Sequence, residues 1–373
     1  SIQHIHKDFQ SISMVEQAKP AMEYKYLGNS GLKVSVVAYG DMLSAETEEN
    51  QQRTNEVIKR CFECGINYFD TAESYGVGAH ERLLGKALKA SGKSRSEFVV
   101  STKIYISDWT FKLPNRTGTS RKHLIEGVKN SLKNLQLDYV DILFCHRFDP
   151  TTPMEEVVLA FKDIFEKGQA FYWATSEWTP SEIAHAHWMC EKYGVPKPIA
   201  EQSQYNMVHR EKFEVDYAYL FDKYKMGATI WGSLSGGLLT GKLVEEDFNK
   251  AGTRYEVASL NAVYQHTKYT DPKNIESTRK MFAGLGEIAK ELGITTAELA
   301  VAWALKNGNV TTAVLGLTKP HYVESALNSV AAYKKLTKEH EIKIDELLGN
   351  APEAGIDWKT FQPKAPRRHK FYQ

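Results

Sequence analysis

The sequence has no long apolar run and almost no net charge, and each absence removes a class of function. None of its apolar runs approaches the roughly 20 residues that are needed to span a bilayer. With 47 Lys and Arg against 46 Asp and Glu, the formal net charge is +1 at pH 7, which gives no strong field for nucleic acid. The first residues are polar and lack the apolar core of a signal peptide. We therefore expect a cytoplasmic protein that binds no nucleic acid.

Cysteine is scarce as well, with four residues in a chain of 373. Cys61 and Cys64 form a CxxC pair, but no second CxxC or HxxxH pair completes a set of four zinc ligands. His185 and His187 are two residues apart in a helical pattern, so they do not share a face of the helix. We expect reduced, structural thiols and no metal site.

The chain also lacks the glycine fingerprint of a Rossmann nucleotide site. Gly76-Val77-Gly78 does not complete GxGxxG, and it does not open a strand–helix unit of the Rossmann type. These glycines indicate a tight turn.

What the chain has instead is an alternation of short β-branched runs and longer helical patterns, which is typical of parallel strands joined by crossover helices. Helices are predicted at Asn50–Cys64 and Ala79–Ser91, and three more begin at Ser120, Pro153 and Pro180. Eight alternating units favour a single closed (β/α)8 barrel, a TIM barrel of the α/β class, over an open sheet. The eight predicted strands are Val34–Tyr39, Ile66–Phe69, Glu97–Thr102, Val140–Phe144, Ala170–Ala174, Ile199–Glu201, Ala228–Trp231 and Thr312–Leu315.

Three further segments complete the predicted organisation. Tyr24–Ser35 carries Asn29-Ser30-Gly31 between two extended runs, which predicts a hairpin ahead of the first barrel strand. Gly232–Asn274 follows the seventh strand with little periodicity, which predicts a long functional loop. We expect an N-terminal arm over 1–22, a barrel domain over 23–335, and a C-terminal helix with a basic tail over 336–373.

Four polar residues follow three consecutive predicted strands. Asp70 follows the second strand, with Tyr75 five residues later, Lys103 follows the third and His146 follows the fourth. Catalytic groups of parallel barrels lie at the carboxyl ends of the strands, so we expect these side chains to meet at one mouth. Each residue alone has a commoner structural interpretation, as a helix cap, a solvated charge or a packed ring. The joint arrangement is what indicates chemistry.

Together these side chains can deliver a proton. The ordinary pKa of a tyrosine, about 10, is too high for acid–base work at neutral pH, and a nearby ammonium group lowers such a pKa. Asp70 can pair with Lys103 and keep it charged. Tyr75 can then give its proton to a carbonyl oxygen that His146 orients. A hydride must come from a cofactor, because no side chain can supply one.

The strings FDTAESYG at 69–76 and STK at 101–103 resemble the signature of the aldo-keto reductases. The likeness extends from about Tyr24 to Val330. Within that superfamily it is strongest to the beta subunits of voltage-gated potassium channels, through LQLDYVDILFCHRFDP at 135–150 and EQSQYNMVHREK at 201–212.

The resemblance implies a role for each matching position and NADP(H) as the cofactor. The catalytic tetrad is matched by Asp70, Tyr75, Lys103 and His146. Trp231 matches the residue on which the nicotinamide stacks, and core packing is its structural alternative. The other matches to cofactor-binding positions are Asp70; Ser176 and Gln202 at the carboxamide; Ser233, Leu234, Gly236 and Lys242 around the pyrophosphate; and Gly316, Thr318, Lys319 and Glu324 at the adenosine 2′-phosphate and the adenine.

The sequence departs from the channel beta subunits at positions that bear on the site. His146 stands where they carry Asn, which favours turnover. Glu177 stands where they carry Arg, and a carboxylate cannot make an arginine's contacts with the cofactor. Asp41 and Met42 replace a Thr-Trp pair and change one wall of the pocket. Aromatic residues after other strands predict a pocket for apolar carbonyl compounds, unless they only pack the loops; they are Tyr105, Trp109, Phe111, Phe148 and Trp178.

Two functions stay open at this point. The first is NADPH-dependent reduction of aldehydes or ketones, with Tyr75 as the proton donor. The second is a regulatory beta subunit of a potassium channel, or a structural subunit of another assembly, which uses bound NADP(H) as a redox sensor. A homotetramer is implied by the resemblance alone, and a monomer is the alternative.

Overall fold

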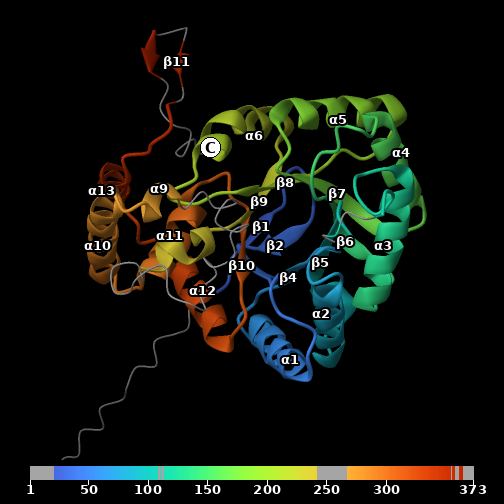
Figure 1. The fold of residues 1–373 in the computed structure, drawn as a ribbon, viewed down its shortest axis with the longest axis horizontal. Helices are drawn as coiled ribbons and strands as arrows, with labels where there is room; N and C mark the ends of the chain where they lie inside the picture. Colours follow the sequence, from blue (N-terminus) through green and yellow to red (C-terminus); the bar gives the residue numbers. More distant parts are fainter. Residues whose placement is uncertain are drawn as a thin grey trace, which may run out of the picture.

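Eight parallel strands close into a barrel in the order β10-β3-β4-β5-β6-β7-β8-β9, and helices surround it (Figure 1). The structure is a computed structural model that describes residues 21–107, 110, 113–241, 267–353, 355–357 and 361–363. The predicted single (β/α)8 barrel is confirmed. Its strands are β3 (Val37–Gly40), β4 (Tyr68–Asp70), β5 (Val99–Ile104), β6 (Val140–Cys145), β7 (Ala170–Ser176), β8 (Ala200–Gln204), β9 (Gly227–Trp231) and β10 (Thr312–Gly316).

The helices begin where side chains or prolines favour a start. Ser120 caps α3 by accepting from the His123 backbone N–H, as the sequence predicts. Thr179 caps α5, whose first residue is Pro180. The main helices are α1 (Glu48–Glu63), α2 (Ala79–Ala90), α3 (Arg121–Leu135), α4 (Met154–Glu166), α5 (Pro180–Tyr193), α6 (Ala218–Tyr224), α10 (Ile275–Glu291), α11 (Thr296–Lys306), α12 (Pro320–Tyr333) and α13 (Lys338–Leu348). Short elements are η1 (Arg95–Glu97), η2 (Lys212–Asp216), η3 (Ser235–Thr240), α9 (Thr267–Thr270), β11 (Ile356–Asp357) and β12 (Gln362–Pro363).

The predicted hairpin is present and lies across one end of the barrel. Strand β1 (Tyr24–Tyr26) pairs antiparallel with β2 (Lys33–Ser35). Leu27 and Val34 are fully buried among the residues that fill the barrel interior. Gly28 has a φ of 58°, and a Cβ there would lie 2.3 Å from the Ile199 carbonyl oxygen, so only glycine fits this close approach. In Figure 1 the hairpin lies within the ring of strands. The hairpin packs against the amino ends of β8 and β9, which leaves the opposite mouth for a site.

Several predicted strand boundaries are wrong, and two of the errors have a clear structural reason. The predicted strand Val34–Tyr39 is two strands, because the chain leaves the hairpin at Ser35 and joins the barrel at Val37. The end of β2 and the start of β3 are both buried, so the hydrophobic pattern does not show where the chain changes from one paired strand to another. Glu97 lies in η1, where it forms a capping box with Ser94, and β5 starts two residues later.

No helix within the described ranges is long and apolar enough to cross a membrane. The predicted long loop after the seventh strand contains η3 and α9, and 242–266 lie outside the described residues.

Candidate active site

The deepest part of the site is an ion pair between Asp70, at the end of β4, and Lys103 in β5. The Lys103 ammonium donates to Asp70 Oδ2 at 2.5 Å and to a backbone carbonyl at 2.8 Å. Ser101 donates to the other carboxylate oxygen at 2.5 Å. Because side chains alternate along a strand, Ser101 and Lys103 share the inner face, whereas Thr102 donates outward to Glu81 of α2 at 2.6 Å.

Lys103 keeps its charge although it is fully buried. Loss of hydration alone favours the neutral amine, but Asp70 and Tyr75 together hold the pKa of Lys103 above its ordinary value. The Lys103 nitrogen lies 5.0 Å from the centre of the Tyr75 ring. The structure therefore brings the phenol, the ammonium and the carboxylate together.

Tyr75 is partly exposed and lies between two imidazole rings. Its ring meets that of His146 edge to face with centroids 5.8 Å apart, and that of His80 with centroids 6.3 Å apart. Burial, reinforced by the charges of Arg147 and Lys103, holds the pKa of His146 well below its ordinary value. The His146 imidazole is therefore neutral at physiological pH and can hydrogen-bond an oxygen atom beside Tyr75.

The loop that carries Tyr75 is fixed by Glu73. The buried Glu73 carboxylate accepts from the Tyr105 backbone N–H at 2.8 Å and lies 3.2 Å from His123 Nε2. Burial opposes a charge on His123, but Glu73 raises the pKa of that imidazole above its ordinary value. Gly76 has a φ of 57°, and a Cβ there would lie 2.9 Å from the first side chain of α2. The turn after Tyr75 therefore requires glycine.

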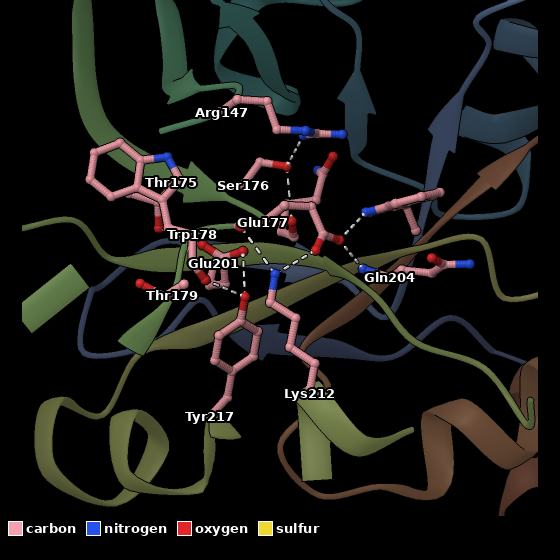
Figure 2. Close-up of polar contacts among 12 residues, drawn as sticks. Arg147, Thr175, Ser176, Glu177, Trp178, Thr179, Glu201, Gln204, Lys212 and Tyr217 are labelled. Carbon is pink, nitrogen blue, oxygen red and sulfur yellow. Dashed lines mark hydrogen bonds and ion pairs between the residues drawn. The ribbon is translucent and has the colours of Figure 1, made fainter. Parts of the chain in front are cut away.

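Ser176 and Gln202, the residues matched to the cofactor carboxamide, are buried paired residues of β7 and β8. The Ser176 hydroxyl donates to the Gln202 carbonyl at 2.9 Å, and Arg147 donates to Ser176 Oγ at 3.1 Å, a contact that Figure 2 shows. The Gln202 amide group donates to Thr229 at 3.2 Å and to Asp70 at 3.4 Å. These residues therefore belong to the same polar cluster as the Asp70–Lys103 pair.

Glu177 is the first residue after β7, and its carboxylate lies among three donors. Oε2 accepts from Lys212 at 2.6 Å, and Oε1 accepts from the Gln204 backbone N–H at 2.5 Å and the Trp231 indole N–H at 2.9 Å. Figure 2 shows Lys212 and Glu177 side by side in this cluster. Burial disfavours the charge, but Lys212 holds the pKa of Glu177 below its ordinary value. Glu177 is therefore an ionised acceptor.

A second carboxyl group, that of Glu201, lies nearby and is buried. Thr175 donates to it at 2.6 Å, and the Tyr217 hydroxyl lies 3.2 Å from its other oxygen (Figure 2). Tyr217 also donates to a backbone carbonyl at 2.6 Å. The Tyr217 hydroxyl is therefore a donor shared between that carbonyl and Glu201. Burial raises the pKa of Glu201 to about 8, which favours its neutral form, whereas Glu177 is the ionised partner of Lys212.

The chain that follows β9 contains the residues matched to the pyrophosphate. Ser233 is 2% exposed, and its hydroxyl has no hydrogen-bond partner among the described residues. Leu234 leads into η3, where three consecutive residues that start at Ser235 have φ values of 47°, 62° and 109°. Gly236 is the second of them. Turns that expose successive backbone N–H groups form concavities for anions. Lys242 lies outside the described residues.

Gly316, Thr318 and Lys319 lie at the junction of β10 and α12. Gly316 is the exposed last residue of β10, and the exposed Lys319 is the N-cap residue of α12. A helix N-terminus, an ammonium and a hydroxyl are the donors that a phosphate group needs. Glu324 lies further along α12, where its half-exposed carboxylate pairs with Arg60 at 3.0 Å.

The predicted pocket walls combine exposed and buried side chains. Met42 is 42% exposed beside the first strand, and Asp41 Oδ1 lies 3.8 Å from Nδ1 of His80. Trp178 is 1% exposed and packs edge-on against Phe148 with centroids 5.2 Å apart. Trp178 therefore supports the loops. Two further predicted wall residues lie outside the described residues, Trp109 and Phe111.

Some members of the cluster were not predicted from the sequence. Ser101 could have been predicted from the sequence, because it is two residues before Lys103 on the same strand and its side chain therefore lies on the same face. The contact of Lys212 with Glu177 could not have been predicted in this way, because the two residues are 35 positions apart and only the closed barrel brings them together.

A buried carboxylate–lysine pair, a phenol and an imidazole lie together at the carboxyl ends of the parallel strands of a (β/α)8 barrel. The model of the Aldo/keto reductase family matches residues 37–348. The chain therefore belongs to the aldo/keto reductase family, and the expected family is confirmed.

Relatives agree with this assignment and with the likeness to channel subunits. A putative voltage-gated potassium channel subunit beta from Schizosaccharomyces pombe is 42% identical over 330 residues, which cover 88% of this chain and 94% of that protein. Probable voltage-gated potassium channel subunits beta from Arabidopsis thaliana and Oryza sativa subsp. japonica are 37% and 36% identical over 331 residues, which cover 89% of this chain and 98% of each relative.

Proposed function

We propose that the chain is an NADP(H)-dependent oxidoreductase that reduces aldehydes or ketones, with Tyr75 as the proton donor. The observation that carries the proposal is the position of the fully buried Lys103 nitrogen, 5.0 Å from the centre of the Tyr75 ring at the barrel mouth. The family assignment supports the same chemistry.

The residues of the chain account for the proton half of the reaction. Negative charge develops on a carbonyl oxygen as the carbonyl is reduced, and Tyr75 neutralises it by giving up its proton. The Lys103 ammonium stabilises the phenolate that remains, and Asp70 holds that ammonium in place. The neutral His146 beside the Tyr75 ring orients the oxygen.

The described residues fit an NADP(H) cofactor. The unpartnered Ser233 hydroxyl and the left-handed turn at Ser235 suit a pyrophosphate. Lys319 and Thr318 at the start of α12 suit a 2′-phosphate. Ser176 and Gln202 suit the carboxamide. When bound in its reduced form, this cofactor supplies the hydride that no side chain can supply.

The test is Tyr75→Phe, which removes one hydroxyl. We expect turnover of an aldehyde panel, followed by NADPH absorbance in a stopped-flow instrument, to fall by about 100-fold or more. The affinity for NADPH, followed by its fluorescence, should stay close to that of the native protein. The exposed Tyr26→Phe is the matched control and should change neither quantity. Unchanged turnover in Tyr75→Phe contradicts the assigned role.

A second candidate is a regulatory subunit of a potassium channel or a structural subunit of another protein assembly, with bound NADP(H) as a redox sensor and a homotetramer as the assembly. The names of the three relatives favour it. It predicts tight retention of NADPH, very slow oxidation with every carbonyl compound, and the mass of a tetramer in light scattering. Fast turnover by a monomer would exclude it.

A further inference from the structure

The indole N–H of Trp231 is anchored by a carboxylate that the proton-transfer chemistry does not use. Trp231 ends β9 at the mouth of the barrel and is partly exposed. Its Nε1 donates to Glu177 Oε1 at 2.9 Å. An indole has one N–H group, so this bond limits the rotation of the ring about its side-chain torsions.

Glu177 is itself held from two directions. Lys212 donates to Glu177 Oε2 at 2.6 Å and to the Glu177 carbonyl at 3.0 Å, and the Gln204 backbone N–H donates to Oε1 at 2.5 Å. Figure 2 shows these groups around one carboxylate. Glu177 also has a φ of 59°, a left-handed conformation that is uncommon outside glycine. The contacts of its carboxylate and carbonyl help to keep the residue there.

We propose that Glu177, fixed by Lys212, is a positioning residue that sets the plane of the Trp231 ring against which the nicotinamide packs. This inference rests on the proposed function, because Trp231 has that role only if the cofactor binds. Reactive groups must be aligned to within a fraction of an ångström, and a misplacement of about 1 Å can cost about 100-fold in rate. A ring that tilts after loss of its anchor therefore slows hydride transfer more than it weakens binding.

The kinetic test compares Glu177→Ala with Glu177→Gln, alone and in a Trp231→Phe background. Single-turnover oxidation of NADPH measures hydride transfer, and NADPH fluorescence measures binding. We expect Glu177→Ala to slow hydride transfer by about 10-fold or more while the Kd for NADPH changes by less than that factor. Glu177→Gln keeps an acceptor for the indole and should recover most of the rate. Glu211→Gln, which changes an exposed carboxylate next to Lys212, is the control.

The double variant shows whether Glu177 acts through Trp231. If it does, Glu177→Ala has little further effect once Trp231 is Phe, because effects of residues in one contact are not additive. An equal slowing in both backgrounds would overturn the proposal.

A second measurement does not need NADPH. In protein labelled with 15N-tryptophan, the Trp231 indole resonance is the one that disappears in Trp231→Phe. It should shift in Glu177→Ala and stay in place in Glu211→Gln. An unshifted resonance in Glu177→Ala refutes the anchoring itself. Absence of NADPH binding by the native protein would instead refute the proposed function and, with it, the cofactor role of Trp231.

Discussion

The buried pair of Asp70 and Lys103 predicts that one variant can regain stability without regaining activity. In Asp70→Asn the carboxylate that neutralises Lys103 is lost, while the ammonium stays fully buried. A backbone carbonyl at 2.8 Å remains as its acceptor, which does not replace a charge. The variant should therefore be less stable, because removal of one partner leaves an uncompensated buried charge.

The expected loss is about 3–5 kcal/mol, since the side chains are 0% and 4% exposed and their charged atoms lie 2.5 Å apart. In a chain of 373 residues, 1 kcal/mol corresponds to roughly 1.3 °C in melting temperature. Asp70→Asn should therefore melt about 4–7 °C lower than the native protein. Asp70→Asn/Lys103→Met removes both charges and should recover most of this loss.

The assay is a thermal melt followed by circular dichroism, combined with the NADPH turnover assay on the same samples. Glu126→Gln, which breaks the exposed Lys122–Glu126 pair, is the control and should not shift the melt. The double variant should regain stability without regaining turnover, because it has no cation to stabilise the phenolate. The reasoning is refuted if Asp70→Asn melts like the native protein, or if turnover returns with stability.

Two further predictions concern stability away from the site. His187 is 5% exposed, and burial lowers its pKa to about 4. In the unfolded chain the pKa of a histidine is about 6.5. Between these two values the unfolded state binds more protons than the folded state, so the free energy of unfolding falls as the pH falls. His187→Phe should remove this loss of stability, which is about 2 kcal/mol at pH 5. The urea midpoints of the variant at pH 7 and pH 5 should therefore differ by less than those of the native protein. If the variant and the native protein show the same difference, His187 is not the source of the pH dependence. In Gly85→Ala of α2 a Cβ would lie 2.2 Å from the Leu135 carbonyl oxygen, whereas in Gly286→Ala of α10 the nearest atom is 3.9 Å away. Gly85→Ala should therefore have a lower melting temperature than the native protein. Gly286→Ala should have a slightly higher one, because its free energy of unfolding should rise by about 0.5–1 kcal/mol. Equal melting temperatures for the two variants would contradict the packing.

The fold and the place where the candidate proton-transfer residues meet could be predicted, because both follow from general rules for parallel barrels. Alternating strand and helix patterns indicate a barrel, and the carboxyl ends of its strands indicate where Asp70, Lys103 and His146 meet. The Glu177–Lys212 pair could not be predicted in this way. Its members come from the end of β7 and from η2, and their contact depends on the closure of the barrel.

The site contains two lysine–carboxylate pairs, one buried and one partly buried, and each serves one half of the proposed reaction. Asp70 neutralises Lys103 beside the phenol, and Glu177 neutralises Lys212 beside the Trp231 indole. Glu201 is close to the second pair, but burial raises the pKa of its carboxyl group to about 8, which favours its neutral form. The proposed position of the Trp231 ring therefore depends on the Glu177–Lys212 pair and not on Glu201.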